Sequence, residues 1–416
     1  MKLLWLCNST PGVVRAHISG KPASGVNWVD HVLSGLRANG MQIRILCPGE
    51  GAQGVLDESC SFATFREGLP YAYSRETEAF FRQELRQFQP DVIHSWGTEY
   101  AHTLAMVNAA EQEAMLPRLV ASIQGLCSVY TGHYAEGVPY GVQRGNTFRD
   151  LVRRDNIAQQ QKKFFLRGEL EVAALKKIQH VIGRTDWDKA CAKQIRPDVQ
   201  YHFCNETLRE PFYQDQWNYS TCKKHHIFAP SCVYPIKGFH YLLEALAIVC
   251  REYPDATVSV PGKSFLKVSR LRRSGYQKYL AELTESHGLT EKITFLGKCS
   301  AEEMKAAFLE ANVFALPSTI ENSPNSLGEA MLLGVPCVSA DVGGVKTLMT
   351  HGEEGYIYQS TAPYMLAYHI RQIFAMEDAA EAIGQKAREH ARKTHDPQKN
   401  LEDLMAIYGE LKERSR

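Results

Sequence analysis

Two glutamates in the second half of the chain have the residue type and spacing to bind sugars. Glu321 and Glu329 are separated by seven residues, and Val313–Leu316 before them predicts a buried strand. A loop carrying Glu321 follows that strand, and Glu329 is expected about one turn inside the next helix. The carboxylate of Glu329 can accept hydrogen bonds from two vicinal hydroxyls, as on a ribose, and Glu321 can accept them from sugar hydroxyls.

The residues between these glutamates predict a helix start that can bind a phosphate. Pro324 suits the first helical position, and Ser323 suits the N-cap before it. The backbone amides of Asn325 and Ser326 would then lie at the positive end of the helix, where phosphate groups bind. The Ser323 hydroxyl can occupy one of these amides, so an anion need not use them all.

Short apolar strands alternate with amphipathic helices along the chain, and this alternation predicts an α/β fold. Leu3–Cys7 and Ile43–Cys47 read as strands, with a helical stripe of apolar residues between them. A second alternating series begins near His225. Such alternation is typical of parallel sheets covered by helices on both faces. Two successive modules of this kind imply a cleft between them, because open parallel sheets bind ligands at the carboxyl ends of their strands.

The predicted organisation is a first domain over residues 1–204 and a second over 205–396. Residues 205–222 have weak periodicity and are interpreted as a linker. Between residues 125 and 154 the pattern lapses, and so long a loop inside a domain is usually functional or mobile. The tail, residues 397–416, predicts an amphipathic helix. Its apolar stripe consists of Leu401, Leu404, Met405 and Tyr408.

The Glu321 and Glu329 pair resembles the Glu-x7-Glu motif of retaining glycosyltransferases of family four. The sequence after this motif also resembles that of the family, with Gly334-Val335-Pro336 and Gly343-Gly344. The resemblance covers essentially the whole chain and is strongest between His226 and Tyr358. It implies the GT-B fold, in which two Rossmann-like domains face each other across a cleft. It also implies that the C-terminal helix crosses back to pack on the first domain.

The resemblance assigns roles in binding a nucleotide-diphosphate sugar. Glu329 would hold the ribose of the nucleotide, and Glu321 would hold the donor sugar. Lys237, in Lys237-Gly238 before a predicted helix, would neutralise the donor diphosphate, a task suited to a compact ammonium group. The alternative for Lys237 is a surface lysine in a turn.

The sequence departs from the family pattern at several positions. Cys232 stands where the family usually has an arginine, five residues before Lys237. Lys263, in the altered strand end Val260-Pro261-Gly262-Lys263, is a candidate to replace that missing cation. Ser24-Gly25 stands in place of a common Gly-Gly, where Gly25 would allow a ligand to approach the backbone or would simply enter a helix.

Gln124 replaces a histidine that many relatives place near the donor sugar. Glutamine cannot act as a general base near neutral pH, so we expect Gln124 to orient the sugar while the departing phosphate takes the acceptor proton. His133 lies in the adjacent irregular segment and either enters the site or is a bystander. Arg184, after the predicted strand His180–Gly183, is a candidate to bind a phosphate or the acceptor, or else forms a structural salt bridge.

No cofactor or essential metal is expected. Asp186-Trp187-Asp188 spells the metal-binding Asp-x-Asp signature of a different glycosyltransferase fold. Here it opens a predicted helix, where aspartate is favoured as a cap and first-turn residue, so a structural role is expected. The 11 cysteines have no zinc-ligand spacing, and their odd number leaves at least one thiol unpaired. The simplest interpretation is a protein of the reducing cytosol.

The overall charge argues against a nucleic-acid binder, because 47 Lys and Arg balance 46 Asp and Glu. Two segments are locally basic: residues 263–278 hold six Lys or Arg and no acid, and residues 144–177 hold nine against four. Both are either solvated faces or contacts for anionic lipid head groups. The cysteines lead us to expect a cytoplasmic protein. The basic segments leave peripheral contact at the inner membrane face open.

The predicted function is a retaining glycosyltransferase that uses a nucleotide-diphosphate sugar and a glycan or lipid-linked acceptor. Surface polysaccharide synthesis follows by analogy to the family alone. One alternative is a sugar-nucleotide epimerase or a phosphorylase on the same fold. Another is a non-catalytic subunit that binds a nucleotide or a glycan, which the residues Cys232 and Gln124 suggest.

Overall fold

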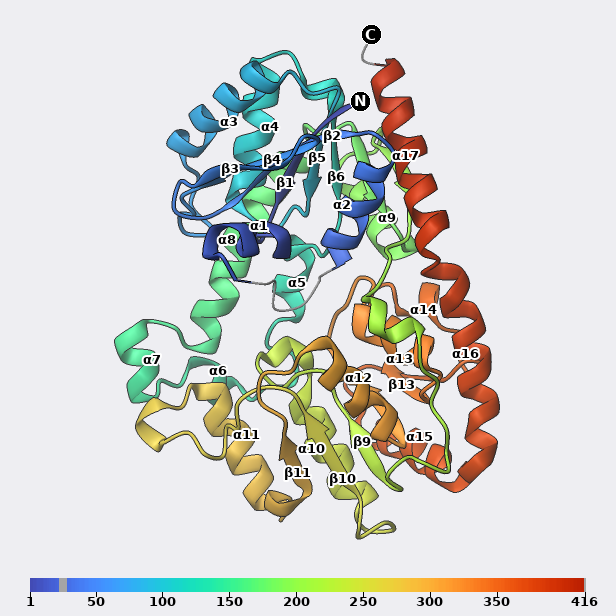
Figure 1. The fold of residues 1–416 in the computed structure, drawn as a ribbon. Coiled ribbons are helices and arrows are strands. Elements are labelled where there is room, and N and C mark those ends of the chain that lie inside the picture. The colour runs from blue at the N-terminus through green and yellow to red at the C-terminus, as the bar shows by residue number, and fades with distance from the viewer. Residues whose placement is uncertain (22–27, 415–416) are drawn as a thin grey trace. The chain divides into compact units, whose positions relative to one another are not determined.

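The computed structural model describes residues 1–21 and 28–414. The chain divides into two compact units built from interleaved segments (Figure 1). Unit 1 comprises Met1–Tyr130, Lys163–Thr207 and His395–Arg416. Unit 2 comprises Thr131–Lys162 and Leu208–Thr394.

Unit 1 is built on a mostly parallel sheet with helices on its faces. Its strands are β1 (Lys2–Cys7), β2 (Gln42–Pro48), β3 (Gln53–Asp57), β4 (Cys60–Phe65), β5 (Val92–Trp96), β6 (Leu119–Ser122), β7 (His180–Gly183) and β8 (Gln200–Phe203). Its helices are α1 (Gly12–Ser19), α2 (Trp28–Ala38), α3 (Arg75–Phe88), α4 (Ala101–Gln112), η1 (Leu116–Arg118), α9 (Asp186–Ile195) and α17 (Pro397–Arg414). Helices α5 (Cys127–His133) and α8 (Ile157–Leu175) pass from one unit to the other.

The strand order of this sheet is β3-β4-β2-β1-β5-β6-β7-β8, and only the β3–β4 pair is antiparallel among the described strands. Leu3 on β1 is paired with Ile43 on β2 and with Val92 on β5. The chain thus extends the sheet in one direction from β1 and later in the other direction from β5. Ligands of open α/β sheets bind at such a switch point, outside the carboxyl ends of the strands.

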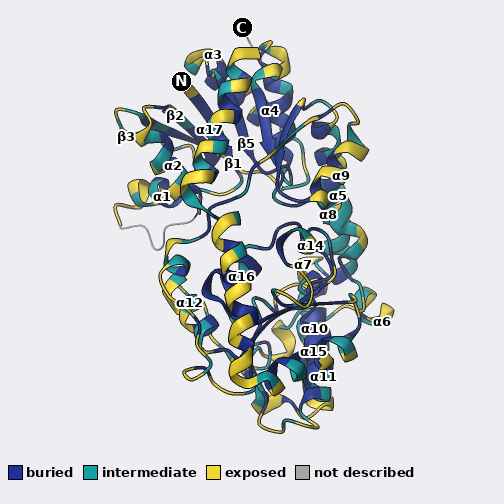
Figure 2. Ribbon diagram, turned by 90° about the vertical axis from the view of Figure 1, so that its right-hand side faces the viewer, coloured by how far each residue is buried: buried dark blue, intermediate teal, exposed yellow. Residues whose placement is uncertain are grey.

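Helix α17 contributes its apolar side to the core of unit 1. Tyr408 is fully buried, accepts a hydrogen bond from Nε1 of Trp5 at 3.2 Å and lies 2.6 Å from Nδ1 of His94. Burial lowers the pKa of His94 to about 3, so this histidine is neutral. In Figure 2 the strands β1 and β5 are dark blue, whereas α17 turns yellow residues outward. The amphipathic pattern of the tail thus follows from its packing on this sheet.

Unit 2 is built on a second sheet, whose described strands are all parallel in the order β11-β10-β9-β12-β13-β14. The strands are β9 (His226–Phe228), β10 (Thr257–Val260), β11 (Ile293–Phe295), β12 (Val313–Leu316), β13 (Cys337–Ala340) and β14 (Tyr356–Tyr358). The helices are α6 (Tyr140–Arg144), α7 (Phe148–Arg153), η2 (Glu210–Tyr213), η3 (Pro235–Lys237), α10 (Phe239–Val249), η4 (Arg270–Arg272), α11 (Gly275–Ser286), η5 (Thr290–Lys292), α12 (Ala301–Glu310), α13 (Asn325–Leu333), α14 (Val345–Leu348), α15 (Pro363–Met376), η6 (Glu377–Ala379) and α16 (Ala380–Thr394).

The division differs from the predicted boundaries in one large segment. Residues 131–162 were expected in the first domain, but they pack in unit 2. Their attachments are remote in sequence: His240 Nε2 lies 3.1 Å from the carbonyl oxygen of Glu136, and Gly275 donates its amide to Asp150 at 2.8 Å. Because these partners come more than 100 residues later, the local pattern of the segment could not reveal them.

None of the helices in residues 1–21 and 28–414 is both long enough and apolar enough to cross a membrane.

Candidate functional site

The loop before α10 is held in direct contact with the loop that follows β12. Gly238 has a left-handed φ of 63°, and a Cβ atom there would lie only 1.8 Å from the carbonyl oxygen of Pro317. Only glycine fits so close a backbone approach. The amide of Thr319 donates to the carbonyl of Ile236 at 2.9 Å, which fixes the same contact. The two loops therefore carry their polar side chains to one place.

The contact between the two loops brings Lys237 and Glu321 together. The sequence analysis assigned both residues to binding of the donor. Lys237 Nζ lies 2.6 Å from Oε1 of Glu321, and the Ser318 hydroxyl donates to the same oxygen at 2.8 Å. The Glu321 side chain is 10% exposed and that of Lys237 is 34% exposed. An ammonium group has three donors, so Lys237 can bind an anion while it keeps Glu321 in place.

A second glycine supports the Glu321 loop from the other side. Gly343 has φ 49°, and a Cβ atom there would lie 1.7 Å from the carbonyl oxygen of Glu321. Gly344 donates its amide to that same carbonyl at 3.2 Å. The structure therefore explains why a glycine stands at position 343, since a side chain there would displace the loop that carries Glu321.

His133 is attached to the Glu321 loop by its backbone. The Thr319 hydroxyl donates to the carbonyl oxygen of His133 at 2.9 Å. The His133 imidazole is 3.0 Å from Glu136 through Nδ1, and the side chain is 43% exposed. The backbone of His133 thus contacts Thr319, which lies two residues before Glu321 in the chain. The His133 ring pairs with Glu136.

The prediction that Ser323 caps the next helix was wrong. Pro324 is the N-cap of α13, and no side chain caps this helix. Pro324 has ψ 111°, an extended value, so helical geometry begins at Asn325, one residue later than expected. The carbonyl of Pro324 accepts hydrogen bonds from Leu327 and Gly328.

This start leaves the first amides of α13 available. Within the described part of the chain, the backbone amides of Asn325 and Ser326 have no hydrogen-bond partner. Both residues are half-buried, and Ser323 beside them is buried. Unpaired amides at a helix N-terminus bind anions, because they sit at the positive end of the helix dipole. Because no side chain caps α13, the backbone amides of Asn325 and Ser326 are both available as donors at the predicted phosphate site.

Glu329 lies inside α13 and is paired with a residue that the sequence analysis missed. Arg209 Nε and Nη2 donate to the two oxygens of Glu329 at 2.6 and 2.7 Å. The Glu329 side chain is 4% exposed and that of Arg209 is 27% exposed. The guanidinium of Arg209 also stacks 4.7 Å from the ring of Phe212. Arg209 lies in the segment that was interpreted as a linker.

Burial raises the pKa of Glu329, and the hydrogen bonds and charge of Arg209 act in the opposite direction. The arginine therefore favours the ionised carboxylate that a ribose site needs. A carboxylate has about four lone-pair positions, so two hydroxyls can still bind Glu329 while Arg209 holds it.

The other predicted donor residues are less well connected. Lys263 is exposed, and among the described residues no hydrogen bond or ion pair joins it to Lys237, Glu321 or Glu329. Cys232 is buried, which raises the pKa of its thiol to about 12, so it adds no charge in place of the family's arginine. Gly25 lies outside the described residues.

In unit 1, the structure joins Gln124 and Arg184 to a third residue. Arg184 Nη2 donates to Oε1 of Gln124 at 3.1 Å, and both Arg184 and Gln124 bind the carboxylate of Glu206. The side chains of Arg184 and Glu206 are 5% and 8% exposed. Of the two roles left open for Arg184, the structure shows the salt bridge. This ion pair fixes the orientation of the Gln124 amide.

Next to Gln124, a hollow of about 310 Å³ lies at the carboxyl ends of β1, β5 and β6. It is lined by Cys7, Asn8, Ser9, Pro11, Val29, Trp96, Glu99, Tyr100 and Gln124. This is the switch point of the unit 1 sheet, where the fold predicts a ligand.

Glu99 and Asn8 are the polar groups in this hollow that the sequence analysis missed. Asn8 Nδ2 and the amide of Thr98 donate to Oε2 of Glu99 at 2.8 and 2.9 Å. Burial raises the pKa of Glu99. Gly97, with φ 119°, is required because a Cβ atom there would lie 2.1 Å from Asn8 Nδ2. Asn8 is the first residue after β1 and Glu99 is the third after β5, and this position just beyond a strand end is the signal that identifies them.

The interpretation of Asp186-Trp187-Asp188 as a helix start is confirmed. Thr185 is the N-cap of α9, and Thr185 and Asp188 form a capping box. Asp188 also accepts hydrogen bonds from the Arg184 amide at 3.0 Å and from the Tyr201 hydroxyl at 2.6 Å. The carboxylate of Asp188 is thus committed to the local structure.

The three residues assigned to the donor, Lys237, Glu321 and Glu329, fall within one recognisable segment. Residues 221–390 match the family model described as "Glycosyl transferases group 1". The match covers less than half of the chain and includes Lys237, Glu321 and Glu329.

Curated relatives match over a similar length. A D-inositol 3-phosphate glycosyltransferase of Corynebacterium urealyticum is 28% identical over 176 residues, which are 42% of this chain and 41% of that protein. The putative colanic acid biosynthesis glycosyltransferase WcaL of Salmonella typhimurium is 28% identical over 169 residues, 39% of each chain. The chain therefore aligns with about two fifths of the length of these relatives.

Solved structures match over nearly the whole chain. Sucrose-phosphate synthase from Thermosynechococcus elongatus superposes with a TM-score of 0.71 at 17% identity and covers 99% of both chains. Anabaena Alr3699/HepE in complex with UDP-glucose superposes with a TM-score of 0.67 at 17% identity, and covers 99% of this chain and 100% of that one. The fold is therefore GT-B, with two Rossmann-like units, as the sequence predicted.

Proposed function

We propose that this chain is a retaining glycosyltransferase that transfers a sugar from a nucleotide-diphosphate sugar to a glycan or lipid-linked acceptor. The observation that carries the proposal is the ion pair between Lys237, at the end of η3, and Glu321, on the loop that leads into α13. The similarity of residues 221–390 to group 1 glycosyl transferases supports it.

Each part of a nucleotide-diphosphate sugar has a candidate partner in unit 2. The Lys237 ammonium and the amides of Asn325 and Ser326 offer positive charge to the diphosphate. Glu329, held by Arg209, accepts the ribose hydroxyls, and Glu321 accepts hydroxyls of the donor sugar. HepE, a structural neighbour, is described in complex with UDP-glucose, so uridine nucleotides are the first donors to test.

The catalytic contribution that we assign to these groups is electrostatic. Negative charge develops on the diphosphate as it leaves, and we assign the stabilisation of that charge to Lys237 and the α13 amides. Gln124 cannot accept a proton near neutral pH, so the departing phosphate takes the proton of the acceptor hydroxyl. In this proposal these groups stabilise the leaving diphosphate without a metal ion.

The hollow in unit 1 is the proposed acceptor site. Glu99 and Asn8 offer hydrogen bonds to hydroxyl groups, and Trp96 and Tyr100 offer aromatic surface. That combination suits a sugar. The name of the relative WcaL supports a glycan acceptor and a role in surface polysaccharide synthesis.

The test is release of free nucleoside diphosphate from a panel of nucleotide sugars, with and without glycan acceptors and with excess EDTA throughout. A transferase releases diphosphate only when an acceptor is added, and NMR of the product then gives the anomeric configuration. Conversion of one nucleotide sugar into its epimer, with no acceptor and no net release of diphosphate, indicates an epimerase. Formation of a sugar 1-phosphate from a glycan and inorganic phosphate indicates a phosphorylase. Tight binding without turnover of any donor indicates a non-catalytic subunit.

A further inference from the structure

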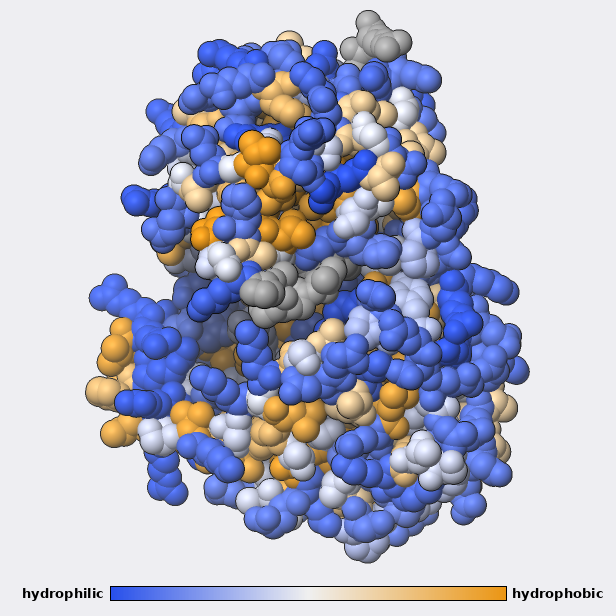
Figure 3. Space-filling model, viewed as in Figure 1, coloured by the Kyte–Doolittle hydropathy of each residue, from blue (hydrophilic) through white to orange (hydrophobic). Residues whose placement is uncertain are grey.

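One surface of unit 2 exposes large apolar side chains next to exposed arginines. We define the α7–η4 surface by four apolar and four basic residues. The apolar residues are Phe148, Leu151, Val152 and Leu271, which are 62%, 63%, 70% and 68% exposed. The basic residues are Arg153, Arg154, Arg270 and Arg272. Figure 3 shows orange residues over α7 at the left edge of the molecule, with blue residues around them.

Helix α7 is amphipathic in the opposite sense to an ordinary surface helix. Phe148, Leu151 and Val152 are spaced i, i+3, i+4, so they share one face, and that face is exposed. Asp150 is on the opposite face and is completely buried. Surface helices normally turn their apolar face to the core. An outward apolar face therefore needs another explanation, and exposed apolar patches commonly mark binding sites.

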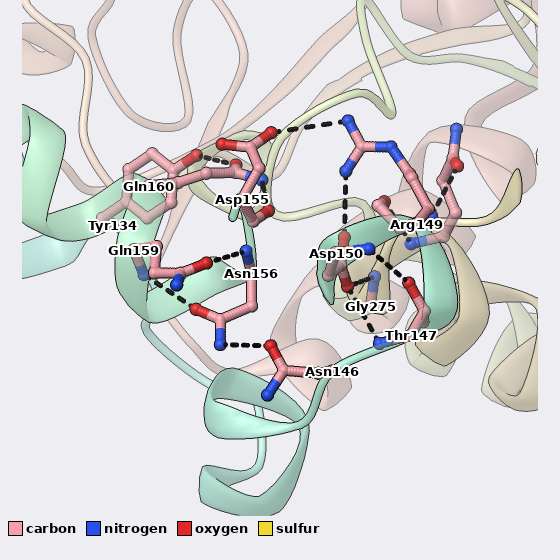
Figure 4. A network of polar contacts seen from close by, with 12 residues as sticks. Tyr134, Asn146, Thr147, Arg149, Asp150, Asp155, Asn156, Gln159, Gln160 and Gly275 are labelled. Carbon is pink, nitrogen blue, oxygen red and sulfur yellow. Dashed lines mark hydrogen bonds and ion pairs between the residues drawn. The ribbon is translucent and has the colours of Figure 1, made fainter. Parts of the chain in front are cut away.

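The inward face of α7 is fixed by hydrogen bonds, as Figure 4 shows. The Asp150 carboxylate accepts hydrogen bonds from the Gly275 amide at 2.8 Å, the Thr147 amide at 3.3 Å and Arg149 at 2.9 Å. Arg149 also pairs with Asp155 at 3.4 Å. These contacts hold the polar face of α7 against the start of α11. The apolar side chains of α7 therefore point outward.

The segments on either side of α7 are fixed by the same kind of network. Asn156 donates from Nδ2 to Asn146 at 2.9 Å and exchanges hydrogen bonds of 2.9 Å with Gln159. The Tyr134 hydroxyl donates to Gln160 at 2.6 Å (Figure 4). The helix is thus anchored at both ends as well as on its inner face.

The fold joins the two basic segments of the sequence, which are more than 100 residues apart. Helix α7 packs against η4, so Arg153 and Arg154 lie in the same region as Arg270 and Arg272. All four are exposed, and none has an ion-pair partner within the described part of the chain. The acid on α7, Asp150, is buried and already bonded. The surface is therefore strongly positive although the whole chain is nearly neutral.

We propose that the α7–η4 surface binds a membrane that contains anionic phospholipids. Its apolar side chains enter the interface between head groups and acyl chains, and its arginines bind the phosphate head groups. A second copy of this chain fits less well, because an isologous contact would bring the same arginines face to face. The inference does not depend on the proposed sugar transfer, and its test needs no donor or acceptor.

The test is co-sedimentation of the full chain with vesicles of phosphatidylcholine alone and of phosphatidylcholine mixed with phosphatidylglycerol. We expect binding to the mixed vesicles only, weakened by salt because exposed charges are screened. Arg270→Gln/Arg272→Gln should weaken that binding about 25-fold, at about fivefold for each arginine. Leu151→Ser/Val152→Ser should weaken it at least about tenfold.

Matched controls come from other exposed helices of unit 2. Tyr364→Ser/Tyr368→Ser on α15 removes two apolar side chains that are 60% and 48% exposed, and Arg392→Gln/Lys393→Gln on α16 removes two exposed charges. Both controls should bind vesicles like the wild type, and thermal melts check that every variant is folded. Equal binding of wild type to both vesicle types, no binding, or equal loss in the controls would overturn the proposal. So would light scattering that shows a wild-type dimer dissociated by Leu151→Ser/Val152→Ser.

Discussion

Arg209 binds both carboxylate oxygens of Glu329, through Nε at 2.6 Å and Nη2 at 2.7 Å. The two residues are 120 positions apart, and Glu329 is almost completely buried within α13. A planar guanidinium can donate two parallel hydrogen bonds to one carboxylate, which a lysine cannot do. The Glu329 carboxylate, which we propose binds the ribose, is thus held in one orientation before any nucleotide binds.

Arg209→Ala should destabilise the protein, because it leaves Glu329 buried without a counter-charge. We expect a loss of about 3 kcal/mol in the free energy of unfolding, measured by chemical denaturation. The double variant Arg209→Met/Glu329→Gln removes both charges and should recover most of that loss. An Arg209→Ala protein as stable as wild type would show that the ion pair does not hold Glu329.

Lys237→Ala should weaken binding of a nucleoside diphosphate and leave binding of the bare nucleoside nearly unchanged. Loss of a charged hydrogen bond suggests about 1.5–3 kcal/mol in calorimetric titration. Lys223→Ala is the matched control, since Lys223 also pairs with a glutamate of unit 2, Glu310, at 2.6 Å. If both ligands weaken alike in Lys237→Ala, the lysine does not contact the diphosphate.

Gly238→Ala should destabilise unit 2 far more than Gly288→Ala. The two glycines have nearly the same φ, 63° and 66°, so the backbone strain of a side chain is equal. Only at Gly238 does the new Cβ atom meet a backbone atom, the oxygen of Pro317, whereas nothing lies within 4 Å at Gly288. Thermal melts of both variants measure the difference. Equal losses would mean that the contact between the two loops is not tight.

The stability of unit 1 should fall as the pH rises through neutrality, because of Glu171. Burial raises the pKa of Glu171 from its usual 4.5 to about 7. The folded state therefore binds the proton more tightly than the unfolded state. This contribution to stability is fully present below about pH 4.5 and is lost as the pH rises through about 7.

Glu171→Gln should remove this loss, which is on the order of 3 kcal/mol between the two limits. In wild type, Ser128 donates to Glu171 through its backbone amide at 2.9 Å and through its hydroxyl at 2.8 Å. The side-chain oxygen of the introduced glutamine can still accept these hydrogen bonds. Glu169→Gln, at an exposed position of α8, is the control. Denaturation curves at acidic and alkaline pH decide the question. The same pH dependence in wild type and Glu171→Gln would contradict the assignment.

The sequence predicted the elements whose signals are local. Strand β7 has the predicted bounds and helix α9 begins at Asp186 as predicted, because a short apolar run and a helix with an acidic first turn are encoded by adjacent residues. The β3–β4 hairpin at the edge of the sheet was missed, since edge strands such as β3 are half-exposed and have no clear apolar run.

The parts of the site that could not be predicted depend on contacts between remote segments. Lys237, Glu321 and Glu329 were found because a spacing and a resemblance identify them. Arg209 was missed because its partner lies 120 positions away, and no local pattern in the supposed linker marks it. The close approach of Gly238 to Pro317 is likewise a property of two loops meeting, which neither loop encodes alone.

The central claim is that Glu329 is the ribose ligand of a donor site in unit 2. Calorimetric titration of wild type and Glu329→Ala with a panel of nucleoside diphosphates tests it most directly. We predict that at least one diphosphate binds the wild type and loses about 1.5–3 kcal/mol in Glu329→Ala, with both proteins folded. Equal affinity of both proteins for that diphosphate, or no binding of any diphosphate by the wild type, would contradict the claim.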